Sequence, residues 1–295
     1  MAKTEHPIVA GYNGSPGSDL ALRWAVSEAH ARGAPLTVCL AWAPYYLRAL
    51  GQPAVDDLAR QRGAEILAPG LRYAESILGP DNVLPLLARG PAAEVLCEQS
   101  AAAEMVVVGS HGHSGVAGLE LGSVASQVTG HGHGPVVVVR GQSRPPNQSP
   151  GPVVAGTDGS LDAQAAITFA FREAALRAAL LIAVCALADT PSVLGGARQM
   201  KADFTSAITR KEKDHPEVTV QRHVEPGTPR TVLLSAAAGA QLLVVGFRGR
   251  GSLDGKSLGS VAHAMLHHAP CPVAVVPAPG LDPVDPGEPA EEARR

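Results

Sequence analysis

Two copies of one glycine pattern carry the chemistry that this sequence suggests. Each copy has two glycines separated by two residues, then nine residues, then a Gly-Ser pair, and the copies are Gly109, Gly112, Gly122 and Ser123, and Gly246, Gly249, Gly259 and Ser260. Glycines in such a loop let backbone N–H groups approach phosphate oxygens. A Gly-Ser pair that begins a helix adds further amides and a hydroxyl. The pattern therefore predicts a loop that cradles phosphate.

The residues inside and beside each loop are the first candidates for ligand contact. They are Ser110, His111, His113, Ser114, Gly115 and Val124 in the first copy, and Phe247, Arg248, Arg250, Gly251, Ser252 and Val261 in the second. Each loop follows a short apolar run, 105–108 or 242–245, which is typical of a buried strand. Open α/β sheets bind ligands at the carboxyl ends of such strands.

A second repeated segment opens each copy of the unit. Val-Ala-Gly11-Tyr-Asn13-Gly-Ser in the first copy matches Val-Ala-Gly156-Thr-Asp158-Gly-Ser in the second, 145 positions later. A carboxylate after a first strand could accept hydrogen bonds from ribose hydroxyls or an adenine amino group. Asn13 keeps one acceptor but has no charge, so the first site is expected to bind more weakly. The competing interpretation is a local role, as an N-cap or turn residue before the helix.

Four histidines in two His-x-His pairs suggest a metal site as an alternative: His111 and His113, His131 and His133. Alternate histidines on a strand can bind zinc or copper. Arg248 and Arg250 stand at the positions of the first pair in the second copy, 137 residues later. Arginine does not bind metal but does contact phosphate, so a cationic loop is the property that both copies share.

Strand and helix patterns alternate around these loops. Expected strands cover 8–12, 36–42, 83–87, 105–108 and 136–139, then 153–157, 180–186, 218–224, 242–245 and 273–276, with helices at 18–32, 56–77, 92–102 and 123–130 in the first unit. Apolar strands alternating with helices indicate right-handed crossovers and a parallel sheet covered on both faces. The final strands, 136–139 and 273–276, would be exposed edges unless they pair with a second domain or subunit.

Composition sets the domain count and excludes several classes of function. A chain of 295 residues is long enough for two cores, and we expect domains at 1–141 and 152–278, a linker at 142–151 and a disordered tail at 279–295. A net charge of −3 argues against nucleic-acid binding. The longest apolar stretch, 178–188, is shorter than the ~20 residues that span a membrane. The N-terminus has no secretory signal and the four cysteines form no C-x-x-C pair, so a cytoplasmic protein with reduced thiols is expected.

With Val-Val-Gly before each glycine pattern and a Pro-Val strand after it, the chain resembles the nucleotide-binding type of universal stress protein, as a tandem protein of the actinobacterial kind. The resemblance covers both halves. It implies two tandem Rossmann-like domains of the adenine nucleotide α-hydrolase type, each with five parallel strands in the order 3-2-1-4-5. It also implies ATP, with or without Mg²⁺, at the switch between strands one and four. Three further contacts follow from it: Val38 and Ala183 beside adenine, and Asp189 at the ribose.

The function that this resemblance implies is regulation of a stress response through ATP occupancy, with a homodimer and an unidentified regulatory protein as partners. No Cys/His dyad, paired carboxylates or positioned nucleophile recurs in both units, so little or no hydrolysis is expected. Two alternatives stay open. One is a slow ATP hydrolase of the α-hydrolase type, although its Ser-Gly-Gly-x-Asp loop is missing. The other is an interaction module in which Asn13 marks a degenerate site.

Overall fold

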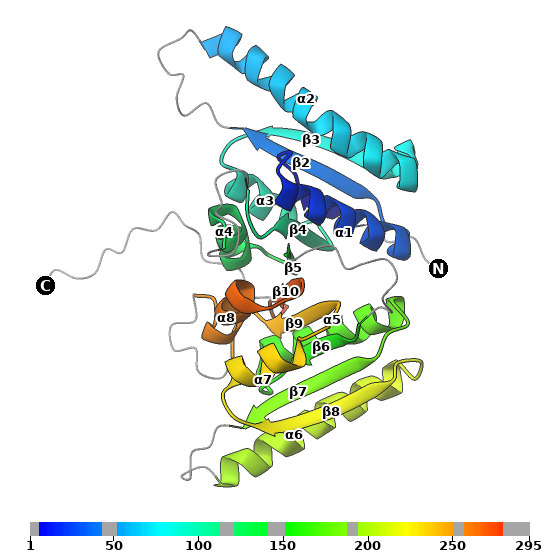
Figure 1. The fold of residues 1–295 in the computed structure, drawn as a ribbon, viewed down its shortest axis with the longest axis vertical. Coiled ribbons are helices and arrows are strands. Elements are labelled where there is room, and N and C mark those ends of the chain that lie inside the picture. Colours follow the sequence, from blue (N-terminus) through cyan, green and yellow to red (C-terminus); the bar gives the residue numbers. More distant parts are fainter. Residues whose placement is uncertain are drawn as a thin grey trace, which may run out of the picture.

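The computed structural model describes residues 6–42, 52–112, 121–140, 151–187, 194–249 and 257–279, with the backbone alone at 52–56 and 194–198. Within these ranges the chain forms two tandem α/β units, which confirms the predicted fold class (Figure 1). Apart from Gly151 and Pro279, the expected linker and tail lie outside the described residues.

The N-terminal unit alternates strands and helices along its whole length. Its elements are β1 (Ile8–Gly11), α1 (Pro16–Arg32), β2 (Leu36–Trp42), α2 (Gln52–Leu78), the 3₁₀ turn η1 (Pro80–Asn82), β3 (Val83–Arg89), α3 (Ala92–Ser100), β4 (Met105–Gly109), α4 (Ser123–His131) and β5 (Val136–Val139).

The C-terminal unit repeats this order. Its elements are β6 (Val153–Gly156), α5 (Leu161–Leu176), β7 (Leu181–Leu187), α6 (Leu194–Asp214), β8 (Val220–Pro226), α7 (Pro229–Ala236), β9 (Leu242–Gly246), α8 (Ser260–His268) and β10 (Val273–Val276). The strand expected at 218–224 starts at Val220 because the amide of Val218 closes a turn onto the carbonyl of His215.

Local sequence explains where the first helix of each unit starts. Ser15 caps α1 by accepting a hydrogen bond from the amide of Ser18, and Ser160 caps α5 through the amide of Ala163. Each serine thereby satisfies one of the amides that a helix start leaves without a partner. The two helices therefore begin at matching points, directly after the opening loops.

All ten strands form one sheet with the order β3-β2-β1-β4-β5-β10-β9-β6-β7-β8. Strands within each unit are parallel, whereas β5 and β10 pair antiparallel and join the two units. Val138 lies opposite Val273, and Val136 lies opposite Val275. The expectation that the final strands pair is therefore confirmed, and the pairing occurs within one chain.

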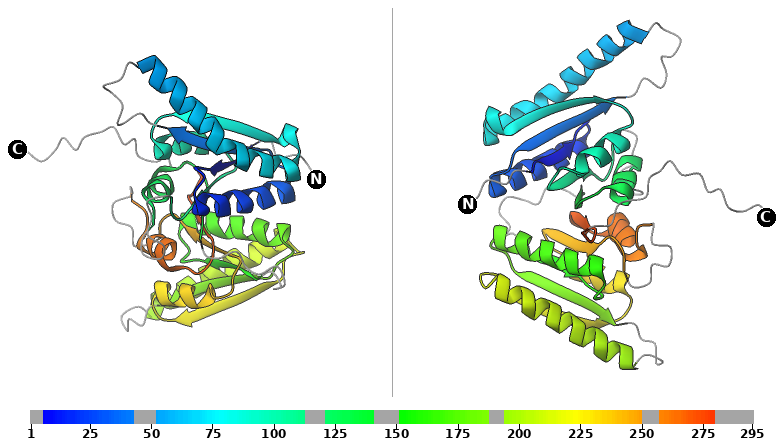
Figure 2. Two further views of the ribbon diagram at one scale, coloured as in Figure 1. Left: turned by 45° about the horizontal axis from the view of Figure 1, so that its top comes forward. Right: turned by 180° about the vertical axis from the view of Figure 1, so that it is seen from behind.

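Helices cover both faces of the sheet (Figures 1 and 2). One face packs against α1, α2, α5 and α6, in a core that includes Leu22, Leu67, Ile167 and Phe204. The other packs against α3, α4, α7 and α8, in a core with Leu96, Val128, Leu233 and Met265. Because side chains alternate across each strand, neighbouring strand residues contribute to different cores.

Other contacts across the junction come from outside the paired strands. The guanidinium carbon of Arg177 lies 5.4 Å from the ring centroid of Trp24, so α5 contacts α1. Arg140, directly after β5, donates to the carbonyl of Ala269 at 3.5 Å. The two units thus meet twice: α1 meets α5 on one face of the sheet, and β5 pairs with β10 in the middle of the sheet.

Candidate functional site

The opening loops adopt the same turn in both units. Asn13 Oδ1 accepts a hydrogen bond from the amide of Ser15 at 3.1 Å, and Asp158 Oδ1 accepts one from the amide of Ser160 at 2.9 Å. The intervening glycine has a φ of 75° in the first loop and 79° in the second, in the region that favours glycine. The local turn role is therefore present at both positions.

The second side-chain atom of each turn residue lies against the glycine loop. A Cβ added to Gly112 would stand 3.3 Å from Asn13 Nδ2, and one added to Gly249 would stand 2.6 Å from Asp158 Oδ2. The opening loop and the glycine loop are therefore neighbours in both units. They differ in chemistry, since the first unit presents an amide donor where the second presents a carboxylate oxygen.

Both glycine loops leave the sheet and return through the same pair of hydrogen bonds. The amide of Ser110 donates to Val139 at 2.9 Å and that of Gly122 donates back to Ser110 at 2.8 Å. In the second unit Phe247 donates to Val276 and Gly259 to Phe247, both at 2.9 Å. The start of each loop is thus held beside the first turn of the helix that follows it.

The helices that follow the loops start without a side-chain cap. Gly122 and Gly259 are the N-cap residues of α4 and α8, and neither has a side chain to accept from the first amides. The Ser-Val pair that begins each helix therefore keeps backbone N–H groups for another acceptor. An anion is well suited to this position, because the helix dipole also favours negative charge there.

The first glycine of each loop lies against the first turn of the helix that follows the opening loop. A Cβ at Gly109 would come within 2.4 Å of the carbonyl oxygen of Gly17, and one at Gly246 within 2.8 Å of the carbonyl carbon of Asp162. Both contacts are with the first turn of α1 or α5. Gly109 and Gly246 therefore allow close packing of helix on loop, and the prediction that they also make room for phosphate stays a prediction.

A cavity of about 490 Å³ lies between these elements in the second unit. Its size falls within the ~300–1,000 Å³ of small-molecule sites. Eight of its lining residues were predicted from the sequence: Gly156, Asp158, Gly246, Arg248, Gly249, Gly259, Ser260 and Val261. The others were not: Thr157, Ala163, Val184, Ala186, Pro229, Leu233, Val245, Ser257, Leu258 and Ala262.

Two predicted contacts of the second unit, Ala183 and Phe247, do not line the cavity. Ala183 belongs to the core beneath α5, and the cavity wall is formed instead by Val184 and Ala186, because successive strand side chains point to opposite faces. Val38 has the equivalent buried position beneath α1. Phe247 is buried in the other core and contributes its backbone to the closure of the loop.

The contribution of α7 was also missed. Leu233 packs against the end of β6, where a Cβ at Gly156 would approach it to 2.9 Å. The sequence held a signal for this helix. Gly90 precedes α3 and Gly227 precedes α7, and the two glycines are 137 positions apart, like the glycine loops.

One side-chain nitrogen at the third position of each glycine loop is buried without a hydrogen-bond partner among the described residues. Ser110 Oγ lies 3.0 Å from His111 Nδ1, while His111 Nε2 has no partner. The guanidinium of Arg248 lies 5.0 Å from the centre of the Phe247 ring, and its Nε has no partner. Both units therefore place a buried nitrogen without a described partner at the same point of the loop: the Nε–H of Arg248 is a donor, and the tautomer of His111 sets the role of its Nε2.

The remaining predicted residues of the first unit lie where the repeat puts them. Gly11 ends β1, Ser123 and Val124 begin α4, and His111 and Gly112 follow β4. Seven candidates fall outside the described residues: His113, Ser114, Gly115, Asp189, Arg250, Gly251 and Ser252.

Within the described ranges no group of three or more His, Cys, Asp or Glu side chains is arranged to hold a metal ion. No helix in those ranges has the length and apolarity to cross a membrane.

The fold and the cavity define a tandem α/β protein with a cavity at the carboxyl ends of the strands of its C-terminal unit. Residues 5–140 and 151–277 each match the model of the Universal stress protein family. The chain therefore belongs to the universal stress protein family.

Known proteins of the same length agree with this assignment. A universal stress protein of Mycobacterium tuberculosis H37Rv is 35% identical over 292 residues, which cover 92% of this chain and 97% of the relative. A universal stress protein of Mycolicibacterium smegmatis is 32% identical over 289 residues, covering 94% and 98%. The crystal structure of a universal stress protein from Archaeoglobus fulgidus superposes with a TM-score of 0.70 at 18% identity, covering 92% and 98%. This last similarity concerns the fold alone.

Proposed function

We propose that the cavity of the C-terminal unit binds ATP, and that the protein is a nucleotide-dependent regulator of a stress response with little or no ATP hydrolysis. The main support is that the uncapped start of α8 and the Asp158 carboxylate line the same cavity. The cavity therefore offers backbone amides that suit an anion and a carboxylate that suits hydroxyl or amino donors.

ATP fits this distribution of groups in one orientation. The phosphates lie at the amides of Ser260 and Val261, next to the Arg248 side chain. The adenosine part lies toward Asp158 and the apolar wall of Val184 and Leu233. Mg²⁺ that accompanies ATP would be held mainly by phosphate oxygens, as is usual for this ion.

The first unit is proposed to hold a weaker site of the same kind. Its helix α4 starts at a glycine like α8, and its loop closes through the same hydrogen bonds. Asn13 replaces the carboxylate, so a hydroxyl donor meets a neutral acceptor at best.

The described lining of the cavity supports the proposal of slow or absent hydrolysis. Among the described lining residues the carboxylate is Asp158, and one of its oxygens is bonded to the amide of Ser160. A hydrolase needs a group that orients the attacking water, and the described lining residues include no second carboxylate and no histidine for this role.

Association into homodimers, if it occurs, needs a surface other than the final strands. β5 and β10 satisfy each other within the chain, so the partner strand that a single-unit protein would take from a second subunit is already supplied.

The test of ATP binding uses a proline at the start of α8. Ser260→Pro removes one backbone N–H at the first helical position, where proline is well tolerated. Gly259 before it has a φ of −64° and a ψ of 147°, which a following proline accepts. Ser260→Ala is the matched control because it removes the hydroxyl alone.

Titration calorimetry with ATP should show S260P binding about 10- to 100-fold more weakly than S260A, as expected for a charge-assisted hydrogen bond of ~1.5–3 kcal/mol. Adenosine affinity should be equal in the two variants. S123P and S123A test the first unit in the same way. If wild-type protein binds no ATP at millimolar concentration, the proposal is wrong and the interaction-module interpretation stands. Phosphate release at many turnovers per minute would favour the hydrolase.

A further inference from the structure

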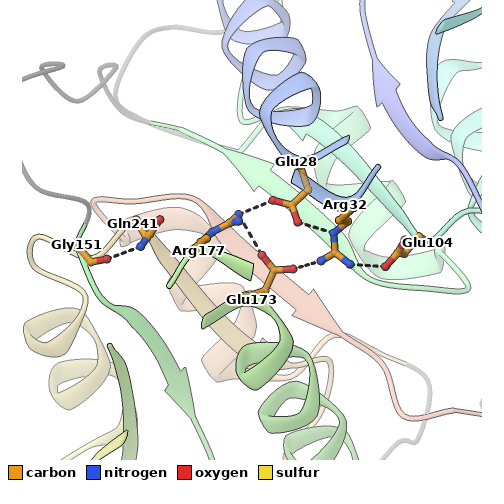
Figure 3. Close-up of polar contacts among 7 residues, drawn as sticks. All are labelled: Glu28, Arg32, Glu104, Gly151, Glu173, Arg177 and Gln241. Carbon is orange, nitrogen blue, oxygen red and sulfur yellow. Dashed lines mark hydrogen bonds and ion pairs between the residues drawn. The ribbon is translucent and has the colours of Figure 1, made fainter. Parts of the chain in front are cut away.

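A cluster of five charged side chains lies where the two units meet (Figure 3). Glu28 and Arg32 come from the last turns of α1, and Glu173 and Arg177 from the end of α5. Glu104 joins them from the residue before β4. The cluster lies at the opposite end of α1 and α5 from the opening loops, about 25 Å away for a 17-residue helix.

Every arginine of the cluster contacts carboxylates of both units. Arg32 Nε donates to Glu28 Oε1 at 2.5 Å, and the two terminal nitrogens of the same guanidinium donate to Glu104 and Glu173. Arg177 Nη2 donates to Glu28 Oε2 at 2.6 Å and lies 3.0 Å from Glu173 Oε2. These contacts tie the two units together through buried charge.

The two central carboxylates have almost no contact with water. The side chain of Glu28 is 1% exposed and that of Glu173 is 0% exposed. With all groups ionised, three carboxylates face two guanidiniums, so the cluster carries one excess negative charge. Burial of an uncompensated charge is strongly unfavourable, and the usual outcome is that a group becomes neutral.

One oxygen of the cluster is well placed to take the proton that neutralises it. Glu173 Oε2 is buried and makes no hydrogen bond among the described residues, because its approach to Arg177 is not aligned for one. Glu104 Oε2 is also without a hydrogen bond, but the side chain of Glu104 is 23% exposed. The fully buried Glu173 therefore gains most from protonation.

The internal repeat shows where the excess charge originates. The corresponding residues of the two units are Glu28 and Glu173, Arg32 and Arg177, and Glu104 and Gln241. The first two pairs are symmetric, whereas the third replaces a carboxylate by a neutral amide that donates to the carbonyl of Gly151. Glu104 is thus the group that breaks the balance of charge.

We propose that this cluster is a proton-binding site, which takes up one proton on Glu173 as the pH falls through neutrality and thereby strengthens the docking of the two units. The inference concerns a part of the molecule separate from the ATP cavity. It stands or fails independently of nucleotide binding.

The groups that face Glu173 determine the direction of the effect. Burial raises the pKa of the Glu173 carboxyl and so does the neighbouring Glu28 carboxylate, while Arg177 and Arg32 act to lower it, and together these effects raise the pKa to about 7. Glu104 acts on the same guanidinium of Arg32. Because the pKa is higher in the folded than in the unfolded protein, the folded state binds more protons between about pH 4.5 and 7. Stability from this group is present at low pH and is lost as the pH rises toward 7.

The test compares urea unfolding of the full-length wild type and the neutral variant Glu173→Gln from pH 5 to 8.5. Between pH 5 and 7 the unfolding equilibrium constant of the wild type should rise about tenfold per pH unit relative to that of E173Q, and then level off. Glu104→Gln removes the excess charge, so its levelling point should fall below 7. Glu65→Gln, on the exposed side of α2, is the matched control and should follow the wild type.

Two further measurements, an NMR titration and hydrogen exchange, complete the test. The carboxyl carbon resonance of Glu173 in the wild type should titrate near pH 7, and a midpoint near 4.5 would overturn the proposal even if E173Q does not fold. Hydrogen exchange of β5 and β10, corrected for its intrinsic pH dependence, should show protection falling from pH 6 to 8 in the wild type alone. Parallel unfolding profiles of the wild type and E173Q, unchanged protection, or an unshifted E104Q transition would each refute it.

Discussion

The two opening loops provide a natural experiment on ligand affinity, and Asp158→Asn transfers the chemistry of the first loop to the second. The substitution should leave the turn intact. Asn13 Oδ1 already makes the equivalent hydrogen bond to a serine amide at 3.1 Å, compared with 2.9 Å for Asp158. Any loss of ATP affinity then comes from the other side-chain atom, which changes from a charged acceptor to a neutral donor.

The size of this loss can be worked out from the contact it removes. A hydrogen bond to a charged group contributes about 1.5–3 kcal/mol, and a factor of ten in affinity corresponds to about 1.4 kcal/mol. Asp158→Asn should therefore weaken ATP binding to the C-terminal unit about 10- to 100-fold. The reverse substitution, Asn13→Asp, should strengthen binding to the N-terminal unit by a similar factor.

Titration calorimetry with ATP and 2′-deoxy-ATP identifies which part of the nucleotide is involved. If the carboxylate accepts from the ribose, wild type should prefer ATP and D158N should discriminate much less. Equal loss for both nucleotides would assign the contact to the adenine amino group instead. Unchanged ATP affinity in D158N, with unchanged thermal stability, would refute the assignment of Asp158 to the ligand.

Three further predictions concern the fold. Gly246→Ala should destabilise the protein by about 1–3 kcal/mol in urea unfolding, because its Cβ would press on the backbone of α5. The control Gly130→Ala should show no loss of stability, since a Cβ there meets no atom within 4 Å. The free energy of unfolding of the wild type should fall relative to that of Glu173→Gln by about 3 kcal/mol from pH 4.5 to above 7, at ~1.4 kcal/mol per unit, and a difference that stays constant with pH would contradict this. Burial raises the pKa of the Cys39 thiol to about 12. A disulfide reagent at pH 8 should therefore modify the less buried Cys97 before Cys39, and mass spectrometry that finds Cys39 labelled first would disprove this order.

The inner strands were predictable because they are continuous apolar runs, most of them bounded by glycine or proline, whereas the edge strand β8 mixes charged and apolar residues. Such runs are required of parallel strands that are buried on both faces, and 136–139 and 273–276 were located to the residue. It was harder to predict which residues of each strand face the cavity. Ala183 and Val184 are both small and apolar, so composition gives no indication of which one faces the cavity.

The charge cluster could not be predicted from local sequence. Glu28 and Glu173 each read as an ordinary polar residue near the end of a helix, and only the docking of α1 on α5 makes them neighbours. The repeat held a usable signal, since Glu-x3-Arg recurs at an interval of 145 residues. Similarly, the glycine repeat marked Gly246 correctly as constrained, but whether helix or ligand imposes the constraint depends on distances that the sequence does not contain.

The junction between β5 and β10 benefits from the fact that both strands belong to one chain. Residues 141–150 connect the units, and covalent linkage of two binding surfaces gives an effective concentration that can reach the millimolar range. An interface that must form at millimolar rather than micromolar concentration needs about 4 kcal/mol less binding free energy. That difference is similar to the ~3 kcal/mol that ionisation of Glu173 removes. Covalent fusion therefore lets this interface keep a titratable carboxylate at its centre, and two halves cut apart within the connection should separate at micromolar concentration above pH 7.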